Sequence, residues 1–485
     1  MATVEILNAV RPDLRWTPVE GSDSIAFRER KAFEIKNAEE LERVLFEAQT
    51  ILGRCVPPSH SSGDETGLVV GYVQSGKTLS FTAVMALARD NGYRLVILIA
   101  GIGNNLKDQS ERRLLADLGL ESGNHAWAHF PNPNPSQDDA TNIENALDAW
   151  SRPNVPANRR RTVLITVLKN HTRLRNLVTV LGRLKLAQVP TLVIDDEADQ
   201  ASLNTKAASN KKKGVQESSA TYDWITQLKQ ALPHHTFIQY TATPQANLLL
   251  HLADGLSPSF AELVTPGEAY VGGREFFAGS PSLVVTIPAK EIPPTYAGAA
   301  TPESLQSALR FYLLGAAVHY MTGQKGHRSM MVHPSQYTGP HADYKAWVGD
   351  SIRSWRDLLE QPEDSSGFQA CAGLFGKEYR LLQGSFPTIP PLNDLLRVMS
   401  QVIGETRIQQ VNSSKVGEKT VKWNASDYWV LIGGQKLDRG FTVEGLTTTY
   451  MPRSLGTGNA DTIQQRARFF GYKRSYLGLC RFFFR

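Results

Sequence analysis

Cysteine is scarce in this chain of 485 residues: only Cys55, Cys371 and Cys480 are present, and their spacing matches no metal-binding pattern. This scarcity excludes a disulfide scaffold or a cysteine-based zinc site, and isolated thiols fit a reducing cytosol. The first residues also lack the basic and apolar segments of a signal peptide. We therefore expect a cytoplasmic protein.

Long hydrophobic runs, internal repeats and a strong charge of either sign are also missing. The densest apolar run, residues 95–101, is far too short to span a bilayer, so we expect no membrane partner. The net charge of +5 permits nucleic-acid binding without arguing for it. With 41% hydrophobic and 20% charged residues, the composition is that of a globular protein. The length allows two or three domains.

What the sequence does contain is a phosphate-loop motif. Residues 71–78, Gly-Tyr-Val-Gln-Ser-Gly-Lys-Thr, fit the pattern G-x-x-x-x-G-K-[ST] at every fixed position. An apolar run precedes the motif and an apolar helical pattern follows it, so backbone N–H groups and a helix N-terminus would face the phosphates. We expect Lys77 to reach the β- and γ-phosphates of ATP and Thr78 to hold Mg²⁺. The predicted nucleotide-binding residues are Gly71, Gln74, Ser75, Gly76, Lys77 and Thr78.

A second motif is an apolar run that ends in carboxylates. Residues 192–199 read Leu-Val-Ile-Asp-Asp-Glu-Ala-Asp. At the carboxyl edge of a parallel sheet, such carboxylates handle Mg²⁺ and the attacking water, so we expect Asp196 to contact Mg²⁺ and Glu197 to polarise that water. The alternative is a solvated acidic loop, which the separation from Lys77 disfavours.

A short threonine-containing turn follows the next apolar run. Thr241-Ala242-Thr243-Pro244 comes directly after residues 236–240. Its two hydroxyls could relay between the carboxylates and a bound polymer, and the alternative is ordinary turn chemistry. We therefore treat Thr241 and Thr243 as candidate coupling residues.

The alternation of apolar runs and helical patterns predicts the fold class. Runs buried on both faces and separated by helices indicate parallel sheets, so we expect an α/β protein with two parallel-sheet domains and a helical insertion in the second; the helicase resemblance given below implies that both domains are RecA-like. The predicted division is an accessory segment at residues 1–60, a first domain at 61–255, a linker or insertion at 256–300 and a second domain at 301–485. The helical insertion is predicted at about 335–425.

These motifs together resemble the core of superfamily 2 helicases and translocases. Asp196-Glu197-Ala198-Asp199 looks like the second motif of that core, in its DEAD form, and Thr241-Ala242-Thr243 looks like the third. Residues 433–442, Gly-Gly-Gln-Lys-Leu-Asp-Arg-Gly-Phe-Thr, resemble the fifth, although Thr442 stands where an acidic residue is common. The resemblance implies nucleotide contacts from Asp438, Arg439 and Gly440.

The sixth motif is matched less completely. Residues 464–474 read Gln-Gln-Arg-Ala-Arg-Phe-Phe-Gly-Tyr-Lys-Arg, whereas the motif carries Gln, Gly-Arg and a second Arg three residues later. Ala467 replaces the glycine, and Gly471 stands where the second arginine belongs. The resemblance implies a coupling role for Gln464 and an arginine finger at Arg468 or Arg474, and it leaves open which.

A closer resemblance is to the Z-one domain family of bacteria and phages. It rests on residues 73–78, on residues 437–446 and on Phe470-Gly471-Tyr472, and it covers roughly residues 60–485. Members are assigned as endonucleases and often lie beside DNA methyltransferases in restriction or phage-defence clusters. Methyltransferase or nuclease partner proteins are therefore implied. Relatives usually continue past the sixth motif, so we expect a C-terminal region to be missing here.

No convincing nuclease site is visible in the sequence. Pro12-Asp13 and Glu29-Arg30-Lys31 formally fit a PD-(D/E)-x-K pattern, whose carboxylates and lysine must lie on adjoining strands around Mg²⁺. Residues 11–31 show little strand alternation, and we interpret them as a solvated charged segment. Cleavage, where it occurs, would then belong to the missing region or to a partner.

Nucleic-acid contacts in such a core come from loops at one edge of each sheet. Residues 101–106 and 166–170 offer backbone amides and short polar side chains that suit phosphate. Two basic runs, residues 159–161 and 211–213, are further candidates, the second favoured because it lies just beyond Asp199; the alternative for each is a solvated loop. The predicted contact residues are Asn104, Asn105, Lys169, Lys211, Lys212 and Lys213.

The favoured function is a DNA-dependent ATPase or translocase of a bacterial restriction or phage-defence system, with ATP and Mg²⁺ as cofactors. DNA is the expected polymer and RNA is the alternative. Two other readings stay open: an ATP-dependent endonuclease, and a nucleotide-switched binding or remodelling module that does not translocate. DNA-stimulated ATP hydrolysis separates the first function from the third, and cleavage of phage or unmethylated DNA separates the second.

Overall fold

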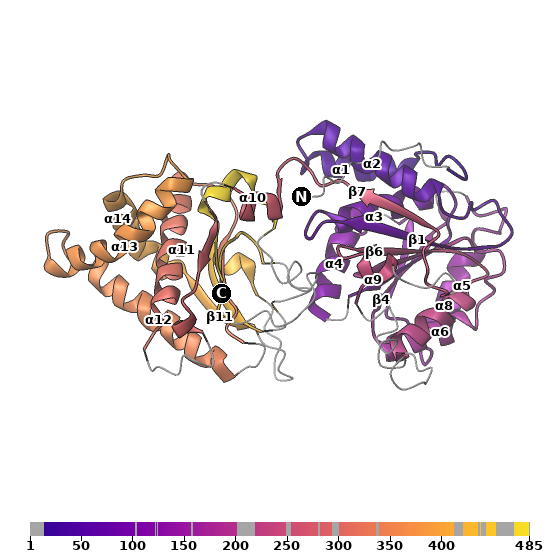
Figure 1. The fold of residues 1–485 in the computed structure, drawn as a ribbon. Coiled ribbons are helices and arrows are strands. Elements are labelled where there is room, and N and C mark those ends of the chain that lie inside the picture. Colours follow the sequence, from indigo (N-terminus) through magenta and orange to yellow (C-terminus); the bar gives the residue numbers. More distant parts are fainter. Residues whose placement is uncertain are drawn as a thin grey trace. The chain divides into compact units, whose positions relative to one another are not determined.

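The chain divides into two compact units, residues 1–268 and residues 269–485 (Figure 1). The computed structural model describes residues 14–101, 104–121, 123, 125–156, 159–200, 219–248, 254–279, 282–292, 300–335, 339–411, 421–434, 437, 443–452 and 470–484, with the backbone alone at 104–110 and 246.

A parallel sheet forms the centre of the first unit. Its described strands are ordered β3-β4-β2-β5-β6-β1-β7, and each neighbouring pair is parallel. The carboxyl ends of β5, β6 and β1 therefore lie next to one another at one edge of the sheet. The strands are β1 (Gly63–Gly71), β2 (Leu95–Ala100), β3 (Trp127–Pro131), β4 (Thr162–Leu168), β5 (Thr191–Asp196), β6 (His234–Thr241) and β7 (Phe260–Val264).

Helices cover both faces of this sheet (Figure 1). One face is covered by α2 (Ala38–Gly53), α3 (Lys77–Asp90) and α4 (Asn104–Asp117), and α1 (Ser22–Ala32) packs on these helices. The other face packs against α5 (Asp139–Asp148), α6 (His171–Leu181) and α8 (Ala220–Gln230), and the short helix α9 (Gln245–Leu248) follows β6. All six residues of β2, Leu-Val-Ile-Leu-Ile-Ala, are buried, as a strand covered on both faces requires.

The amino-terminal helices belong to the first unit. The sequence pattern predicts α2, which begins after Asn37, whose side chain accepts hydrogen bonds from the N–H groups of Glu39 and Glu40. The interpretation as a solvated segment is wrong for residues 22–31, which form most of α1 and bury one face. Within α1, Asp23 and Lys31 are buried charged groups, each held by an ion pair, Asp23 with Arg89 of α3 and Lys31 with Asp117 of α4. Sequence alternation missed α1 because its buried face includes charged residues.

The nuclease pattern has no strand geometry in this part of the molecule. Glu29, Arg30 and Lys31 lie on α1, whereas the pattern needs adjoining strands. Pro12 and Asp13 lie outside the described residues. Within the described part of the chain, no cluster of three or more His, Cys, Asp or Glu side chains has the arrangement of a metal site.

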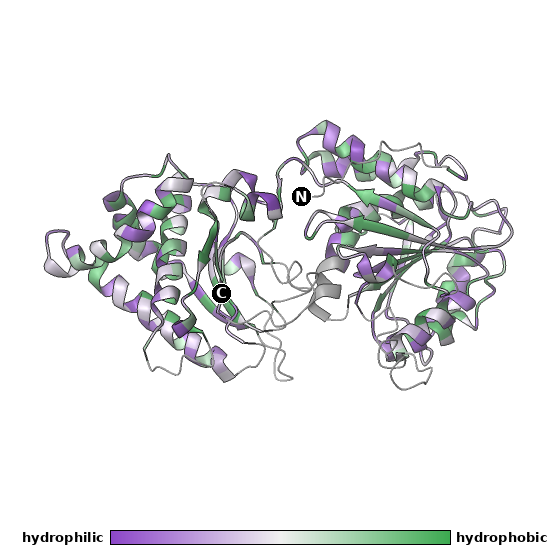
Figure 2. Ribbon diagram, viewed as in Figure 1, coloured by the Kyte–Doolittle hydropathy of each residue, from purple (hydrophilic) through white to green (hydrophobic). Residues whose placement is uncertain are grey.

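The second unit also has a parallel sheet, whose described strands are ordered β11-β12-β10-β13-β15-β9. They are β9 (Val284–Thr286), β10 (Arg328–Val332), β11 (Arg407–Val411), β12 (Tyr428–Gly433), β13 (Leu446–Met451) and β15 (Arg481–Phe484). A small antiparallel pair, β8 (Tyr270–Val271) with β14 (Gly471–Tyr472), lies beside it. Much of the hydrophobic ribbon, green in Figure 2, lies in the strands of the two sheets.

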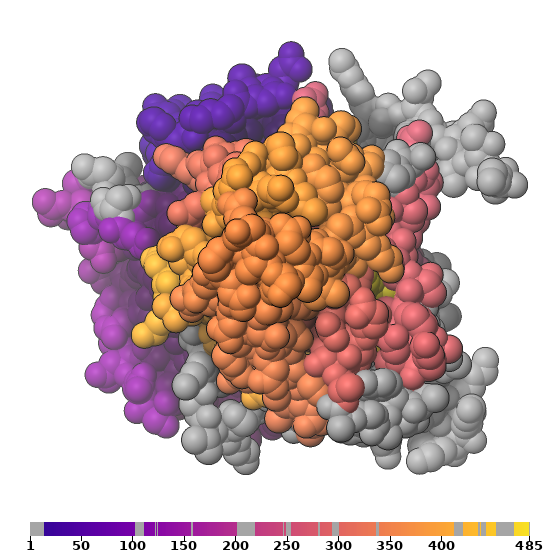
Figure 3. Space-filling view, turned by 90° about the vertical axis from the view of Figure 1, so that its left-hand side faces the viewer, coloured from indigo at the N-terminus to yellow at the C-terminus, as the bar shows by residue number. Residues whose placement is uncertain are grey.

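Three long helices are inserted between β10 and β11: α12 (Gly339–Leu359), α13 (Ser366–Ser385) and α14 (Leu392–Glu405). They pack with α11 (Glu303–Thr322) around one hydrophobic core and form much of the orange face in Figure 3. The shorter helices are α10 (Gly273–Phe277), η2 (Ala289–Glu291), η3 (Trp423–Ala425) and η4 (Arg474–Leu479). The helical insertion that the sequence predicts is therefore present.

The predicted fold class, an α/β protein with two RecA-like parallel-sheet units and a helical insertion in the second, is confirmed. Residues 256–300, for which the sequence predicts a linker or insertion, contribute β7 to the first sheet and β8, α10 and β9 to the second unit. No helix among the described residues is long and apolar enough to cross a membrane.

Candidate nucleotide-binding site

The phosphate-loop motif connects β1 to α3 in the first unit. Gly71 ends β1, and a Cβ atom there would lie 2.9 Å from Cγ of Lys77, so any other residue would displace the lysine stem. Gly76 precedes the first residue of α3 with φ of 97°, a left-handed conformation that glycine adopts without strain. Both glycines of the motif are therefore required by the local geometry, and Lys77 and Thr78 occupy the first turn of α3.

Backbone strain is concentrated near this loop. Gln74 in the loop and Glu197 after β5 have φ of 57° and 53°, and Asn132 is the third non-glycine residue with positive φ in the described chain. Such conformations cost roughly 1–3 kcal/mol each and persist where the surroundings hold them. Their presence in two motifs that the sequence singles out is consistent with a functional site.

The carboxylates that follow β5 form a buried acidic corner. The side chain of Asp196 is almost fully buried, and its Oδ1 accepts a hydrogen bond of 3.0 Å from the N–H of Glu197. Burial and the neighbouring Glu197 carboxylate raise the pKa of Asp196 to about 7, while Lys77 and Lys169 act in the opposite direction. A divalent cation would stabilise the charged form of such a carboxylate, so the corner fits a metal ion held by Asp196 and by the hydroxyl of Thr78.

Lys169 supports this corner from inside. Its ammonium lies 2.7 Å from Oδ1 of Asp195, and both side chains are completely buried. The same ammonium donates to the carbonyl oxygens of Asp196 at 2.7 Å and Glu197 at 2.8 Å. The sequence-based prediction that Lys169 contacts nucleic acid is therefore wrong, because its ammonium is buried and all three of its contacts are to protein oxygens.

A charged residue directly after a buried strand was the sequence signal that could have identified this role. Lys169 follows β4, and Asp195 lies within the buried β5. A buried carboxylate needs a partner, and the carboxyl ends of parallel strands meet at one edge of a sheet. The pairing of a strand-end lysine with a strand-embedded aspartate could therefore have been anticipated.

The threonine turn is hydrogen-bonded to the acidic motif. The hydroxyl of Thr241 donates to Oδ1 of Asp199 at 3.0 Å, and the N–H of Thr243 donates to the Thr241 hydroxyl, also at 3.0 Å. The N–H of Ala198 donates to the carbonyl of Tyr240 at 2.9 Å. The two motifs are therefore joined by direct contacts between the ends of β5 and β6.

Strand β6 also contacts α3, the helix that follows the phosphate loop. The hydroxyls of Ser80 and Tyr240 lie 3.2 Å apart, and the ring of Phe81 meets the Tyr240 ring edge-on with centroids 5.6 Å apart. All three side chains are buried. A movement of α3 would therefore displace Tyr240 of β6, directly before Thr241.

The remaining predicted site residues are only partly placed. Arg474, in the second unit, is about half exposed, donates to the carbonyl of Tyr270 at 3.2 Å and lies 3.7 Å from the Glu275 carboxylate. Asn104 and Asn105 begin α4, but their side chains are not described. The other predicted residues lie outside the described residues: Lys211, Lys212, Lys213, Asp438, Arg439, Gly440, Gln464 and Arg468.

Fold and motifs together define a two-unit α/β protein with a phosphate-loop motif beside buried carboxylates in its first unit. Comparison with protein families adds a match to the Z1 domain over residues 304–485, which confirms the predicted resemblance for that part of the chain. No curated protein matches the chain.

Solved helicase structures resemble the chain at low identity. The Hef helicase domain of Pyrococcus furiosus is 12% identical with a TM-score of 0.34, covering 87% of this chain and 92% of its own. Dbp5 of S. cerevisiae, bound to RNA and ADP BeF3, is 12% identical with a TM-score of 0.41, covering 92% and 86%. The DUF1998 helicase MrfA, bound to DNA and AMPPNP, is 12% identical with a TM-score of 0.46, covering 97% and 51%.

Proposed function

We propose that this chain is a helicase-like ATPase that couples ATP hydrolysis to movement on nucleic acid. The main support is the geometry of the first unit, where the phosphate loop, the acidic corner and the threonine turn meet at the carboxyl edge of one parallel sheet. Ligands of open α/β sheets bind at this edge. The Z1 match supports a role in bacterial restriction or phage defence, since the family resemblance implies that setting.

ATP and Mg²⁺ are the cofactors that the residues of the first unit fit. When bound, Mg²⁺ neutralises charge on the phosphates. Lys77 binds the β- and γ-phosphates, Thr78 and Asp196 hold the cation, and Glu197 orients and polarises the attacking water. Lys169 is a positioning residue, since it fixes the backbone of Asp196 and Glu197 from behind.

Coupling to a polymer runs through the threonine turn. Because the hydroxyl of Thr241 contacts Asp199, a shift of the acidic motif during hydrolysis changes the turn that follows β6. From the second unit, we propose that Asp438, Arg439 and Gly440 contact the nucleotide and that Gln464 and an arginine finger, Arg468 or Arg474, complete the reaction. Asn104, Asn105 and Lys211–Lys213 remain proposed contacts to the strand.

The experiment is steady-state ATP hydrolysis by the full chain with no polymer, with single-stranded DNA, with duplex DNA and with RNA. The proposal predicts Mg²⁺-dependent turnover that at least one polymer stimulates, together with ATP-dependent displacement of streptavidin from a biotinylated strand. Turnover without stimulation or displacement would contradict coupling and favour the nucleotide-switched module. Cleavage of phage or unmethylated DNA would favour the endonuclease.

A further inference from the structure

A groove of about 770 Å³ lies along the edge strand β3 of the first unit. Phe130 of β3 forms part of its apolar lining, and Asn142 and Asn145 come from one face of α5. The loops before β3 and β4 contribute His125, Arg159 and Arg161. Nothing in the nucleotide-binding site uses these residues.

The groove is positively charged and open to solvent. Arg159, Arg161 and His125 are exposed, and no carboxylate is among the side chains that line the groove. Within the described part of the chain, neither Arg159 nor Arg161 forms an ion pair with a carboxylate. Guanidinium groups that are not engaged by protein carboxylates are suited to bind phosphate oxygens in a bidentate manner.

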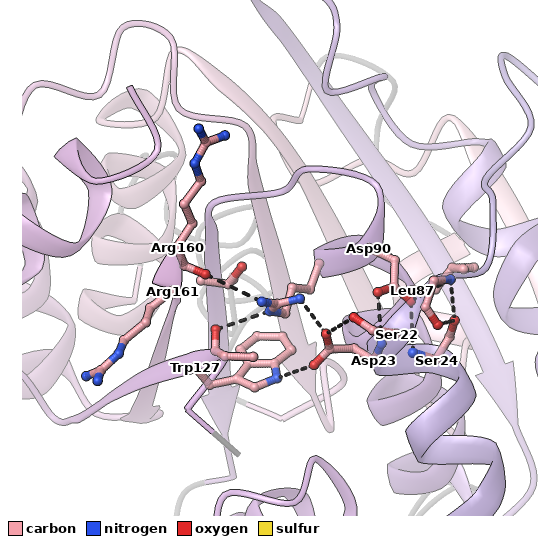
Figure 4. Close-up of polar contacts among 12 residues, drawn as sticks. Ser22, Asp23, Ser24, Leu87, Asp90, Trp127, Arg160 and Arg161 are labelled. Atoms are coloured by element: carbon pink, nitrogen blue, oxygen red, sulfur yellow. Dashed lines mark hydrogen bonds and ion pairs between the residues drawn. The ribbon is translucent and has the colours of Figure 1, made fainter. Parts of the chain in front are cut away.

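A network of hydrogen bonds holds the loops in place before any ligand binds (Figure 4). The guanidinium of Arg89, which pairs with buried Asp23, donates to the carbonyl of Ala126 at 3.1 Å and to that of Arg160 at 3.4 Å. Trp150 Nε1 donates to the carbonyl of Arg161 at 2.8 Å. The carbonyls therefore face inward, and Figure 4 shows the Arg161 side chain extending away from the network.

The groove lies away from the phosphate loop. His125 and Arg161 lie within two residues of the starts of β3 and β4, so the basic residues lie at the amino ends of their strands. The phosphate loop follows β1 at its carboxyl end. Because the strands are parallel, these ends belong to opposite edges of the sheet, and the groove is a second site.

We propose that this groove binds a segment of single-stranded nucleic acid, with phosphates on Arg159 and Arg161 and a base against Phe130. The choice of polymer rests on the proposed function. Basic side chains beside an accessible aromatic are the combination that binds single strands without reading sequence. The two amides of Asn142 and Asn145 can donate to or accept from the edges of any base. Because the groove is open to solvent and not an enclosed cavity, it favours a continuing strand over an enclosed small molecule.

The test is binding of fluorescent oligo-dT and oligo-rU by the full chain, measured by anisotropy over a series of salt concentrations. In the double variant Arg159→Ala, Arg161→Ala we expect affinity to fall at least about fivefold. The slope of log affinity against log salt should become less steep by about 1.4, since each phosphate contact to a single strand contributes roughly 0.7. The comparison of the two oligonucleotides decides between DNA and RNA.

Matched variants separate a binding role from a structural one. Lys36→Ala removes an exposed cation between α1 and α2, on the opposite face of the sheet, and should leave affinity and salt slope unchanged. Phe130→Ala should weaken binding about tenfold through lost stacking, whereas Phe130→Leu, which keeps the packing against the core, should weaken it nearly as much. A cooperative thermal unfolding transition above the assay temperature and unchanged ATP turnover without polymer show that each variant is folded.

Photo-cross-linking with 5-iodouracil-substituted oligonucleotides locates the strand directly. Cross-links to residues 125–130 or 142–149 of the full chain support the proposal. Wild-type affinity and salt slope in the double arginine variant, or cross-links confined to other segments, overturn it. Binding of poly-glutamate with the same arginine dependence, without oligonucleotide binding, overturns it in favour of an acidic polypeptide.

Failure of the groove and failure of the proposed function give different results. Polymer-stimulated ATP hydrolysis that is identical in the wild type and the double arginine variant, with identical oligonucleotide affinity, removes the groove alone. Groove cross-links in a chain whose ATP turnover no polymer stimulates remove the coupled ATPase and keep the groove.

Discussion

Two buried ion pairs, one in each unit, have similar chemistry and different surroundings. In the first unit, Lys169 lies 2.7 Å from Asp195 with both side chains fully buried. In the second, Arg310 lies 3.0 Å from Glu378 with both side chains at most 4% exposed. Breaking a buried pair by removing one partner costs about 3–5 kcal/mol, because a charge is left without a partner. On stability alone, the two pairs are equivalent.

Their remaining contacts make the pairs different. The Lys169 ammonium also holds the carbonyls of Asp196 and Glu197. Arg310 joins α11 to α13 and faces the ring of Trp355, with 5.7 Å from its Cζ to the ring centroid. The first pair therefore positions Asp196, the proposed metal ligand, and Glu197, which is proposed to polarise the attacking water. The second pair stabilises a helical core. A buried ion pair affects catalysis only where it positions the backbone of catalytic residues. We therefore expect the two pairs to differ in their effect on ATP turnover and not in their effect on stability.

In the first unit, the largest effect on ATP turnover is expected at Lys77. Lys77→Ala removes the charge at the β- and γ-phosphates, so ATP turnover should fall to background, at least about a thousandfold, with thermal unfolding unchanged. Steady-state phosphate release is the measurement, and Lys36→Ala is the control for loss of one positive charge. Normal turnover in Lys77→Ala would refute the assignment of the phosphate loop.

The next largest effect concerns the arginine finger, which extends the comparison to the second unit. An arginine that stabilises transition-state charge contributes about a thousandfold or more to turnover and little to affinity. We favour Arg468→Ala over Arg474→Ala as the damaging change, because Arg468 has the helicase-like spacing from Gln464 and Arg474 already contacts Tyr270 and Glu275. ATP hydrolysis at saturating polymer decides between the two variants, and parental turnover in both would exclude an arginine finger at either position.

A smaller and more specific effect is expected at Glu197. Glu197→Gln keeps the size of the side chain and removes the base, so the variant should bind ATP and hydrolyse it about a hundredfold more slowly. Nucleotide binding by calorimetry and single-turnover hydrolysis together measure the two steps. Lost binding with unchanged hydrolysis per bound nucleotide would exclude the catalytic role.

The smallest effect is expected at Thr241. Thr241→Val removes the hydrogen bond that the hydroxyl donates to Asp199, worth about 1.5–3 kcal/mol, and the one that it accepts from the N–H of Thr243, and Thr241→Ser restores both. We expect polymer-free turnover to stay close to wild type and stimulation by the polymer to fall several-fold in the valine variant alone. Equal stimulation in wild type, valine and serine variants would show that the threonine turn does not couple the two activities.

Sequence patterns predict the parts of the molecule whose residues depend on local geometry. The glycines of the phosphate loop, the apolar runs of β2 and β5 and the helix α2 each follow from spacing and residue type. The helices inserted before β11 follow from their apolar periodicity. What these patterns cannot give is the pairing of distant residues.

The misses share that cause. From the sequence, Lys169 is predicted to be an exposed loop cation, because the sequence does not show that β4 and β5 lie in one sheet. Asp23 and Lys31 are likewise predicted to be solvated, because their partners Arg89 and Asp117 are distant in the sequence. Arg481 begins β15, and its buried guanidinium donates to the carbonyl of Leu381 at 3.0 Å. In each case a tertiary ion pair or hydrogen bond makes burial of a charge tolerable.

The most direct measurement is ATP turnover per folded molecule in Lys169→Met and Arg310→Met, with the free energy of unfolding measured alongside. Both variants should lose about 3–5 kcal/mol of stability, and Asp195→Asn offers a milder break of the first pair should Lys169→Met fail to fold. We predict that breaking the Lys169–Asp195 pair lowers ATP turnover at least about tenfold, whereas Arg310→Met leaves ATP turnover at the wild-type value. Wild-type turnover after the Lys169–Asp195 pair is broken would contradict the claim that this pair positions the acidic corner for ATP hydrolysis.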